Sequence, residues 1–204
     1  MNRLRFYAAR LIRDDAALMK MSVTQADLLA PLTGRRVALI GNARALGNHT
    51  HGPAIDAADL VIRINRAPMP AANSHGTRTD WLGLATRLSD DDRARIHPGR
   101  ILWMSPKRKR LDYATATSPG FYLHPLADYH ALATTLNAPP TTGAMLIDLL
   151  LRSDLRQLSL YGFDFFVSLS LSGRRNADQV PHDFGAESHW VSTLAANDPR
   201  LIRN

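Results

Sequence analysis

The chain has 204 residues, of which 45% are hydrophobic and 21% charged, so we expect one globular domain with a substantial core, not a disordered or fibrous chain. It contains no cysteine, which excludes a disulfide framework and a thiolate nucleophile and favours a reducing, cytoplasmic location. The net charge of +7 favours polyanionic partners, but it does not choose among nucleotides, nucleic acid and anionic membrane surfaces.

Residues 1–30 are predicted to form an N-terminal amphipathic helical segment. Leu4, Tyr7 and Leu11 recur at helical spacing, with arginines interspersed among them. Packing of this segment on its own domain is the favoured interpretation. Peripheral contact with the inner membrane is the alternative, because an apolar stripe flanked by arginine suits anionic headgroups.

The remaining residues, 31–204, contain short apolar runs typical of buried strands, separated by helical stretches. The strand candidates are residues 35–42, 59–65, 79–85, 100–105 and 157–163, and residues 143–152 have the all-round apolar character of a buried helix. This alternation predicts an α/β fold: a single-domain, Rossmann-like sandwich with a mainly parallel sheet flanked by helices.

Two asparagines follow the first two predicted strands. Asn42 comes after Gly41 at the end of the first, and Asn65 ends the second. Ligands bind at the carboxyl ends of strands in open α/β sheets, and a carboxamide offers both a donor and an acceptor. Each asparagine alone is more often a turn residue. No GxGxxG fingerprint follows Gly41, so NAD is not expected.

Residues 139–143, with the sequence PPTTG, precede the predicted buried helix. A threonine can cap that helix while free backbone N–H groups point outward, which is an arrangement suited to an anion. An ordinary N-cap is the alternative.

Among eight histidines, His182 is the best candidate for a general base. Imidazole titrates near neutral pH, and Asp183 and Glu187 are close enough in sequence to orient it. The loose cluster of His49, His51 and His75 matches no zinc template, so no metal is expected. The basic run 107–110 has no nucleic-acid signature beside it, so no specific nucleic-acid partner is expected.

The order and spacing of these segments closely resemble the large, small and very small sialylmotifs of the animal-type sialyltransferases, glycosyltransferase family 29. The large motif is matched by Gly41-Asn42, Gly52-Pro53-Ala54-Ile55-Asp56 with Asp59, Arg63-Ile64-Asn65-Arg66-Ala67-Pro68, and the downstream Gly76-Thr77-Arg78-Thr79. The small motif is matched by Pro140-Thr141-Thr142-Gly143 and Tyr161-Gly162-Phe163, and the very small motif, His-x4-Glu, by His182 and Glu187.

The resemblance implies a GT-A-like variant of the predicted fold and a glycosyltransferase domain over residues 31–204. It implies an inverting, metal-independent transfer of sialic acid from CMP-sialic acid to a terminal sugar hydroxyl of a glycan or glycolipid, with no cofactor. The implied catalytic base is His182, and the implied supporting residues are Gly41 and Glu187. The implied donor-binding residues are Asn42, Asn65, Thr141, Thr142 and Gly143.

Two departures from the family pattern leave alternatives open. The family's disulfide is impossible here, which fits a compact, cysteine-free, bacterial-type member. The family's His- and Tyr-containing third motif should lie in the interval 167–181, which has neither residue. Its function could pass to Arg174 or Arg175 through charge, or to Ser168 and Ser170 through hydrogen bonds. A donor such as CMP-Kdo or another nonulosonic acid, and a catalytically degenerate CMP-sugar-binding protein, remain the alternatives.

Overall fold

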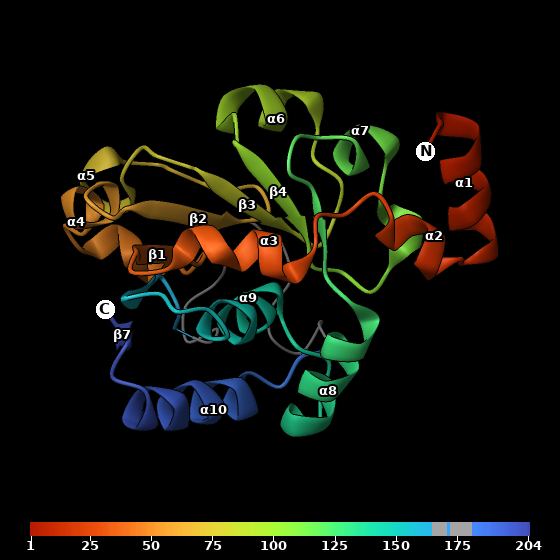
Figure 1. Ribbon diagram of the computed structural model, residues 1–204. Helices are drawn as coiled ribbons and strands as arrows, with labels where there is room; N and C mark the ends of the chain where they lie inside the picture. Colours follow the sequence, from red (N-terminus) through yellow and green to blue (C-terminus); the bar gives the residue numbers. More distant parts are fainter. Residues whose placement is uncertain (165–170, 172–180) are drawn as a thin grey trace.

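The computed structural model describes residues 1–164, 171 and 181–204 and consists of one parallel sheet covered by helices on both faces (Figure 1). The described strands are β1 (Arg36–Ile40), β2 (Leu60–Ile64), β3 (Trp81–Leu84), β4 (Arg100–Trp103), β5 (Tyr122–Leu123), β6 (Gln157–Tyr161) and β7 (Leu201–Arg203). They lie in the order β5-β4-β3-β2-β1-β6-β7, and every described pair is parallel. The predicted fold class is therefore confirmed.

Helices and short 3-10 turns connect these strands. The helices are α1 (Arg3–Ile12), α2 (Asp15–Met19), α3 (Gln25–Leu29), α4 (Gly52–Asp56), α5 (Ala72–His75), α6 (Asp90–Ile96), α7 (Tyr113–Ala116), α8 (Leu126–Leu136), α9 (Thr142–Leu151) and α10 (Phe184–Asn197). The 3-10 turns are η1 (Ala30–Leu32), η2 (Arg44–Asn48) and η3 (Arg108–Arg110). No helix in the described ranges is both long and apolar enough to cross a bilayer.

The strands are apolar almost throughout because both faces of the sheet are covered. Leu39 of β1 and Ile62 of β2 pack with α3, α8, α9 and α10 on one face. Their neighbours Ala38 and Val61 point to the other face and pack beneath η2 and α4. This alternation explains why continuous apolar runs, and not alternating ones, correctly predicted β1, β2, β3, β4 and β6.

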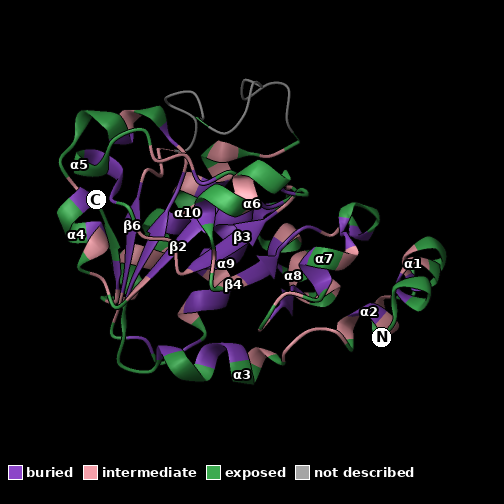
Figure 2. Cartoon of the chain, turned by 90° about the horizontal axis from the view of Figure 1, so that it is seen from above, coloured by how far each residue is buried: buried purple, intermediate pink, exposed green. Residues whose placement is uncertain are grey.

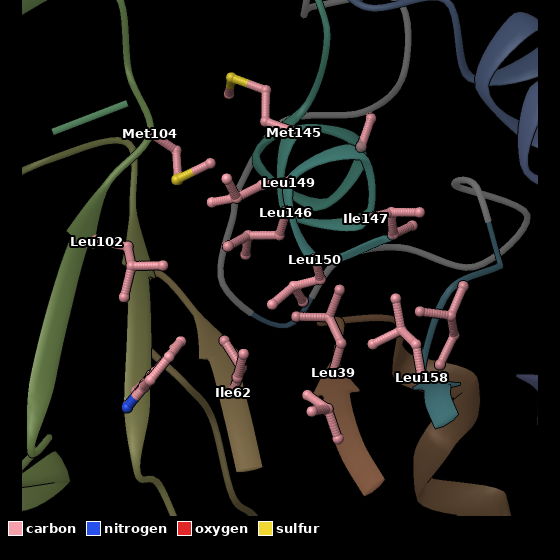
Figure 3. Packing of buried hydrophobic residues seen from close by; sticks show 14 of the residues in the cluster. Leu39, Ile62, Leu102, Met104, Met145, Leu146, Ile147, Leu149, Leu150 and Leu158 are labelled. Carbon is pink, nitrogen blue, oxygen red and sulfur yellow. The ribbon is translucent and has the colours of Figure 1, made fainter. Parts of the chain in front are cut away.

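Helix α9 lies at the centre of the larger core cluster (Figure 3). Leu146, Leu149 and Leu150 project from it toward the sheet and are fully buried. A Cβ on Gly83 of β3 would lie 2.7 Å from Leu146 Cδ1, so the glycine lets α9 sit close to the sheet. Each buried leucine contributes on the order of 2 kcal/mol to folding. The core therefore holds α9, including its first turn, firmly against the face of the sheet.

The N-terminal segment is three short helices, and of its expected apolar stripe only Tyr7 packs against the core. Phe6 and Ala9 of α1 are buried, whereas Leu4 and Leu11 are exposed. Helix α1 ends at Ile12 and is capped by Arg13, which has a left-handed conformation with φ of 61°. Side-chain caps from Asp14 and Thr24 begin α2 and α3. These two caps start new helices within residues 1–30, where the sequence suggested one helical segment.

Candidate active site

The carboxyl ends of β1 and β2 bring the two predicted asparagines together. Asn42 Nδ2 donates to the carbonyl of Ile64, the residue before Asn65, at 3.2 Å. Asn65 turns away from β2 with φ of 54°, a left-handed conformation that asparagine tolerates. Its Oδ1 accepts from the backbone N–H of Ala85 at 2.9 Å. Both side chains thus fix neighbouring strand ends, and Asn65 Nδ2 donates to no described residue.

Glycines allow the segments of the site to approach one another closely. Gly41 N donates to Tyr161 O at 2.7 Å, and a Cβ on Gly41 would collide with the carbonyl oxygen of Gly162. A Cβ on Gly143 would lie 2.6 Å from Phe163 Cε1. The loops after β1 and β6 and the first turn of α9 therefore pack against one another only because these positions lack side chains.

Thr141 is the N-cap of α9 and is tied to α10. Its Oγ1 accepts from Ala144 N at 3.1 Å and donates to Glu187 Oε2 at 2.8 Å. Its backbone N–H donates to Glu187 Oε1 at 2.6 Å. The first backbone N–H groups of an α-helix have no partner within the helix. Thr142 and Gly143 therefore present the N–H groups that a ligand could use, whereas the Thr141 side chain already has partners.

Burial raises the pKa of Glu187 to about 7, although the two hydrogen bonds from Thr141 act in the opposite direction. Glu187 is only 3% exposed, and the nearby charge of Asp183 adds to the upward shift of its pKa. Glu187 is consequently a partly protonated group that holds the loop before α9 in place.

His182, the first residue of the very small motif, contacts the same loop as Glu187, the last residue of that motif. Its Nδ1 lies 2.8 Å from the carbonyl oxygen of Pro139. A carbonyl oxygen only accepts, so Nδ1 carries the proton and the neutral ring keeps its lone pair on Nε2. This tautomer leaves Nε2 able to take a proton from a bound hydroxyl group. His182 and Glu187 thus attach one end of α10 to residues 139–141.

The middle of the large motif has a supporting function. The Asp56 carboxylate accepts from Thr77 N at 2.9 Å and from Arg78 N at 3.1 Å. Burial alone would raise the pKa of Asp56, but these hydrogen bonds and the Arg63 guanidinium hold it below its ordinary value. Arg63 is buried in β2, which lowers its pKa to about 10, and donates to the carbonyls of His75 and Arg78. This network fixes α4 and α5 beside the strand ends.

The structure does not bring the three loop histidines together as a metal centre. The His49 and His51 rings stack at 5.1 Å, while His75 is buried with Nδ1 at 2.7 Å from Ser74 Oγ. Within the described ranges no group of three potential ligands could hold a metal ion. Ser168, Ser170, Arg174 and Arg175, the candidates for the missing third motif, lie outside the described residues.

Sequence reasoning missed two contributions to this site. The ring of Phe163 packs against Gly143, and the carbonyl of Pro139 sets the tautomer of His182. Phe163 also lines a pocket at the ends of β1, β6 and β7, with Ala43, Ala45, Leu46, His49, His51, Gly162, Asp164 and Asn204. The Tyr-Gly-Phe ending was a visible signal for Phe163, but a backbone carbonyl leaves no trace in a sequence.

Comparisons with known proteins agree with the motif resemblance. A family model described as glycosyltransferase family 29 (sialyltransferase) matches residues 9–89, which include the large motif. No curated protein matches the chain by sequence. The match therefore supports the region of Asn42 and Asn65 directly, while Thr141, His182 and Glu187 lie beyond it.

Solved structures extend the likeness over the whole fold. A mammalian sialyltransferase structure has a TM-score of 0.58 and 19% identity, covering 84% of this chain and 69% of that chain. A second, in complex with Gal-beta-1-3GalNAc-ortho-nitrophenol, has a TM-score of 0.58 and 17% identity, covering 100% and 86%. The sialyltransferase CstII from Campylobacter jejuni, in complex with cytidine-5'-monophosphate, has a TM-score of 0.58 and 13% identity, covering 84% and 80%. At such identities the likeness shows a shared fold.

Proposed function

We propose that this chain, a sialyltransferase-like glycosyltransferase similar to family 29, transfers sialic acid from CMP-sialic acid to a sugar hydroxyl of a glycan or glycolipid. The observation that carries the proposal is the attachment of His182 and Glu187 to residues 139–141. These contacts support His182 as the base, since its Nδ1 is engaged by the loop before α9 and its Nε2 can accept a proton there. The family match and the CMP complex of a structural neighbour support the choice of a CMP-sugar donor.

In the proposed donor complex, Asn42 and Asn65 hold the nucleotide at the ends of β1 and β2. The backbone N–H groups of Thr142 and Gly143 face the phosphate at the positive end of α9. Thr141, proposed from the motif as a further donor contact, has its hydroxyl engaged by Glu187 and Ala144. Its contribution is therefore to position the two residues that follow it.

The transfer step needs one base and a stabilised leaving group. His182 Nε2 takes the proton of the acceptor hydroxyl while its oxygen attacks the anomeric carbon of the donor. The new carbon–oxygen bond forms as the bond from that carbon to the phosphate oxygen breaks, and CMP leaves with the electron pair. A single displacement of this kind inverts the anomeric configuration.

Metal independence is part of the proposal. The leaving phosphate already carries its negative charge, and preorganised N–H groups at a helix terminus can stabilise the charge that develops. Transfer that persists in EDTA would support this step, and loss of transfer restored by a divalent cation would refute it.

Two alternatives each rest on a specific observation. The residues assigned to the donor are assigned to its nucleotide and phosphate and none to the transferred sugar, so CMP-Kdo or another nonulosonic acid is compatible with the same assignment. The interval 167–181 contains neither His nor Tyr, which motivates a degenerate CMP-sugar-binding protein. CMP binding without turnover would favour that second alternative.

The decisive experiment measures CMP release and sugar transfer to a glycan panel, with CMP-sialic acid and CMP-Kdo compared in the presence of EDTA. His182→Ala is expected to lower kcat by at least about a hundredfold, the usual contribution of a general base. His189→Ala is the matched control, because His189 is an exposed histidine of helix α10, which begins two residues after His182. Equal activity of the wild type and His182→Ala would remove His182 from the mechanism.

A further inference from the structure

Helix α1 presents an apolar face to solvent. Leu4, Leu11 and Ile12 are 82%, 84% and 72% exposed, and Met1 is 44% exposed. These are four of the six exposed large hydrophobic residues among those described, and they all fall within the first 12 residues. Leu4, Leu11 and Ile12 also lie along one side of the helix by its 3.6-residue period. Such a cluster marks an interaction surface, unlike isolated apolar residues.

The opposite side of α1 fixes the helix to the domain. Phe6 is fully buried and packs edge-on against Tyr113 of α7, with ring centroids 5.5 Å apart. Arg10 Nη1 donates to the carbonyl of Leu111 at 2.8 Å. Figure 2 shows α1 at one end of the molecule, with exposed residues along its outer side. The outer apolar face is therefore presented by an already folded and docked helix.

Cations are concentrated in and around α1. Helix α1 contains Arg3, Arg5 and Arg10 and no acidic residue, and Arg13 follows it. The turn η3 contacts α1 and adds the exposed Lys109 and Arg110, preceded by Lys107. None of these seven forms an ion pair with a described residue.

The nearest acidic side chains have other partners. Asp14 caps α2 through a hydrogen bond from Ala17 N at 2.9 Å. Asp15 pairs with the buried Arg108 at 2.7 Å. Because these acids are engaged within the fold, the positive charge around α1 remains available to an external anionic partner.

We propose that the outer face of α1 docks on an anionic lipid bilayer. Leucine and isoleucine would enter the headgroup boundary while Arg5, Arg13 and Lys109 pair with lipid phosphates, the arrangement that interfacial helices use. A second copy of the chain is disfavoured because a symmetric pair would place the same cations against each other. The inference rests on α1 and η3 and does not depend on the transferase activity.

Co-sedimentation with phosphatidylcholine vesicles, containing or lacking phosphatidylglycerol, tests this docking. The whole chain is expected to sediment with anionic vesicles at low salt, and to be released by high salt or by omission of the anionic lipid. Leu11→Ser is expected to weaken vesicle binding about tenfold. In the double variant Arg5→Gln with Lys109→Gln, each removed charge is expected to weaken vesicle binding about fivefold.

Matched controls separate docking from general effects. Ile202→Ser removes an exposed apolar residue at β7, and Arg35→Gln with Arg156→Gln removes two exposed charges beside the amino ends of β1 and β6. Both controls should bind as the wild type does. Equal binding to neutral vesicles, equal loss in the controls, or no binding at all would overturn the proposal. A dimer in light scattering that Leu11→Ser dissociates would also overturn it.

A second measurement does not depend on loss of binding. Leu11→Trp places a fluorophore on the proposed face, and the wild-type signal of the three native tryptophans is subtracted. With anionic vesicles we expect a blue shift and protection from an aqueous quencher. An unchanged spectrum with vesicle-bound protein would show that a different surface docks.

Discussion

The ionisation of Glu187 gives a direct test of the contact between α10 and the loop before α9. Its carboxyl is buried, and its pKa rises from the ordinary 4.5 to about 7. Between about pH 4.5 and pH 7, the folded chain therefore keeps a proton on Glu187 that the unfolded chain releases. Stability conferred by the protonated group is present below about pH 4.5, declines as the pH rises through about 7, and then levels off.

The size of this effect follows from the shift. A change from 4.5 to about 7 corresponds to about 3 kcal/mol in total, most of which is lost between pH 5 and pH 8. Glu187→Gln stays neutral, and its Oε1 can still accept from Thr141 N. The free energy of unfolding of this variant should therefore not show the decline between pH 5 and pH 8 that Glu187 causes in the wild type.

Urea unfolding of the wild type and Glu187→Gln at several pH values measures the difference. Asp91→Asn, at an exposed acid in the first turn of α6, is the control and should keep the wild-type slope between pH 5 and pH 8. Glu187 is the only glutamate in the chain, so selective carbon-13 labelling of glutamate gives one side-chain carboxyl resonance to titrate. Titration of that resonance near 4.5, or equal pH slopes for wild type and Glu187→Gln, would refute the reasoning.

Three further predictions concern packing and charge. Gly143→Ala should lower the free energy of unfolding by about 1 to 3 kcal/mol and weaken donor binding, because the added Cβ would meet Phe163. Phe163→Leu in the same chain should restore part of both losses. Gly47→Ala is the control in urea unfolding, because the nearest atom to its Cβ would be 4.0 Å away. Arg108→Met should lower the free energy of unfolding by about 2 to 3 kcal/mol, because the Arg108 guanidinium is buried and donates to Asp15 and two carbonyls. Lys109→Met, at an exposed neighbour, is the control and should leave the thermal midpoint of unfolding unchanged. Neutralising Arg174 and Arg175 should raise the donor KM or lower kcat, and unchanged kinetics would remove them from the mechanism.

Much of the sheet could be predicted because buried parallel strands have a strong sequence signal. The runs that became β1, β2, β3, β4 and β6 are apolar on both faces, which distinguishes them from surface elements. The predictions did not include β5 or β7, which have two and three residues. Strands this short are defined by pairing with β4 and β6 and have no periodicity of their own.

The N-terminal helix shows where periodicity alone falls short. Leu4, Tyr7 and Leu11 formed a clear apolar stripe, but Phe6 and Ala9 are the residues that α1 buries, and Tyr7 is only partly buried. Spacing identifies the sides of a helix, whereas the choice of the side that packs depends on the surface opposite it. Here Tyr113 and Leu111 supply that surface from more than a hundred residues away in sequence.

By itself the sequence determined the fold class, the family resemblance and the residue types at the candidate site, because strand burial and motif spacing are local properties of the chain. Only the tertiary structure decided what each residue contacts. It engaged the Thr141 hydroxyl with Glu187, put Thr142 and Gly143 in the first turn of α9, and fixed the His182 proton on Nδ1 through Pro139. These outcomes depend on hydrogen bonds between residues more than forty positions apart, and the geometry of such bonds exists only once the sheet has brought α9 and α10 together.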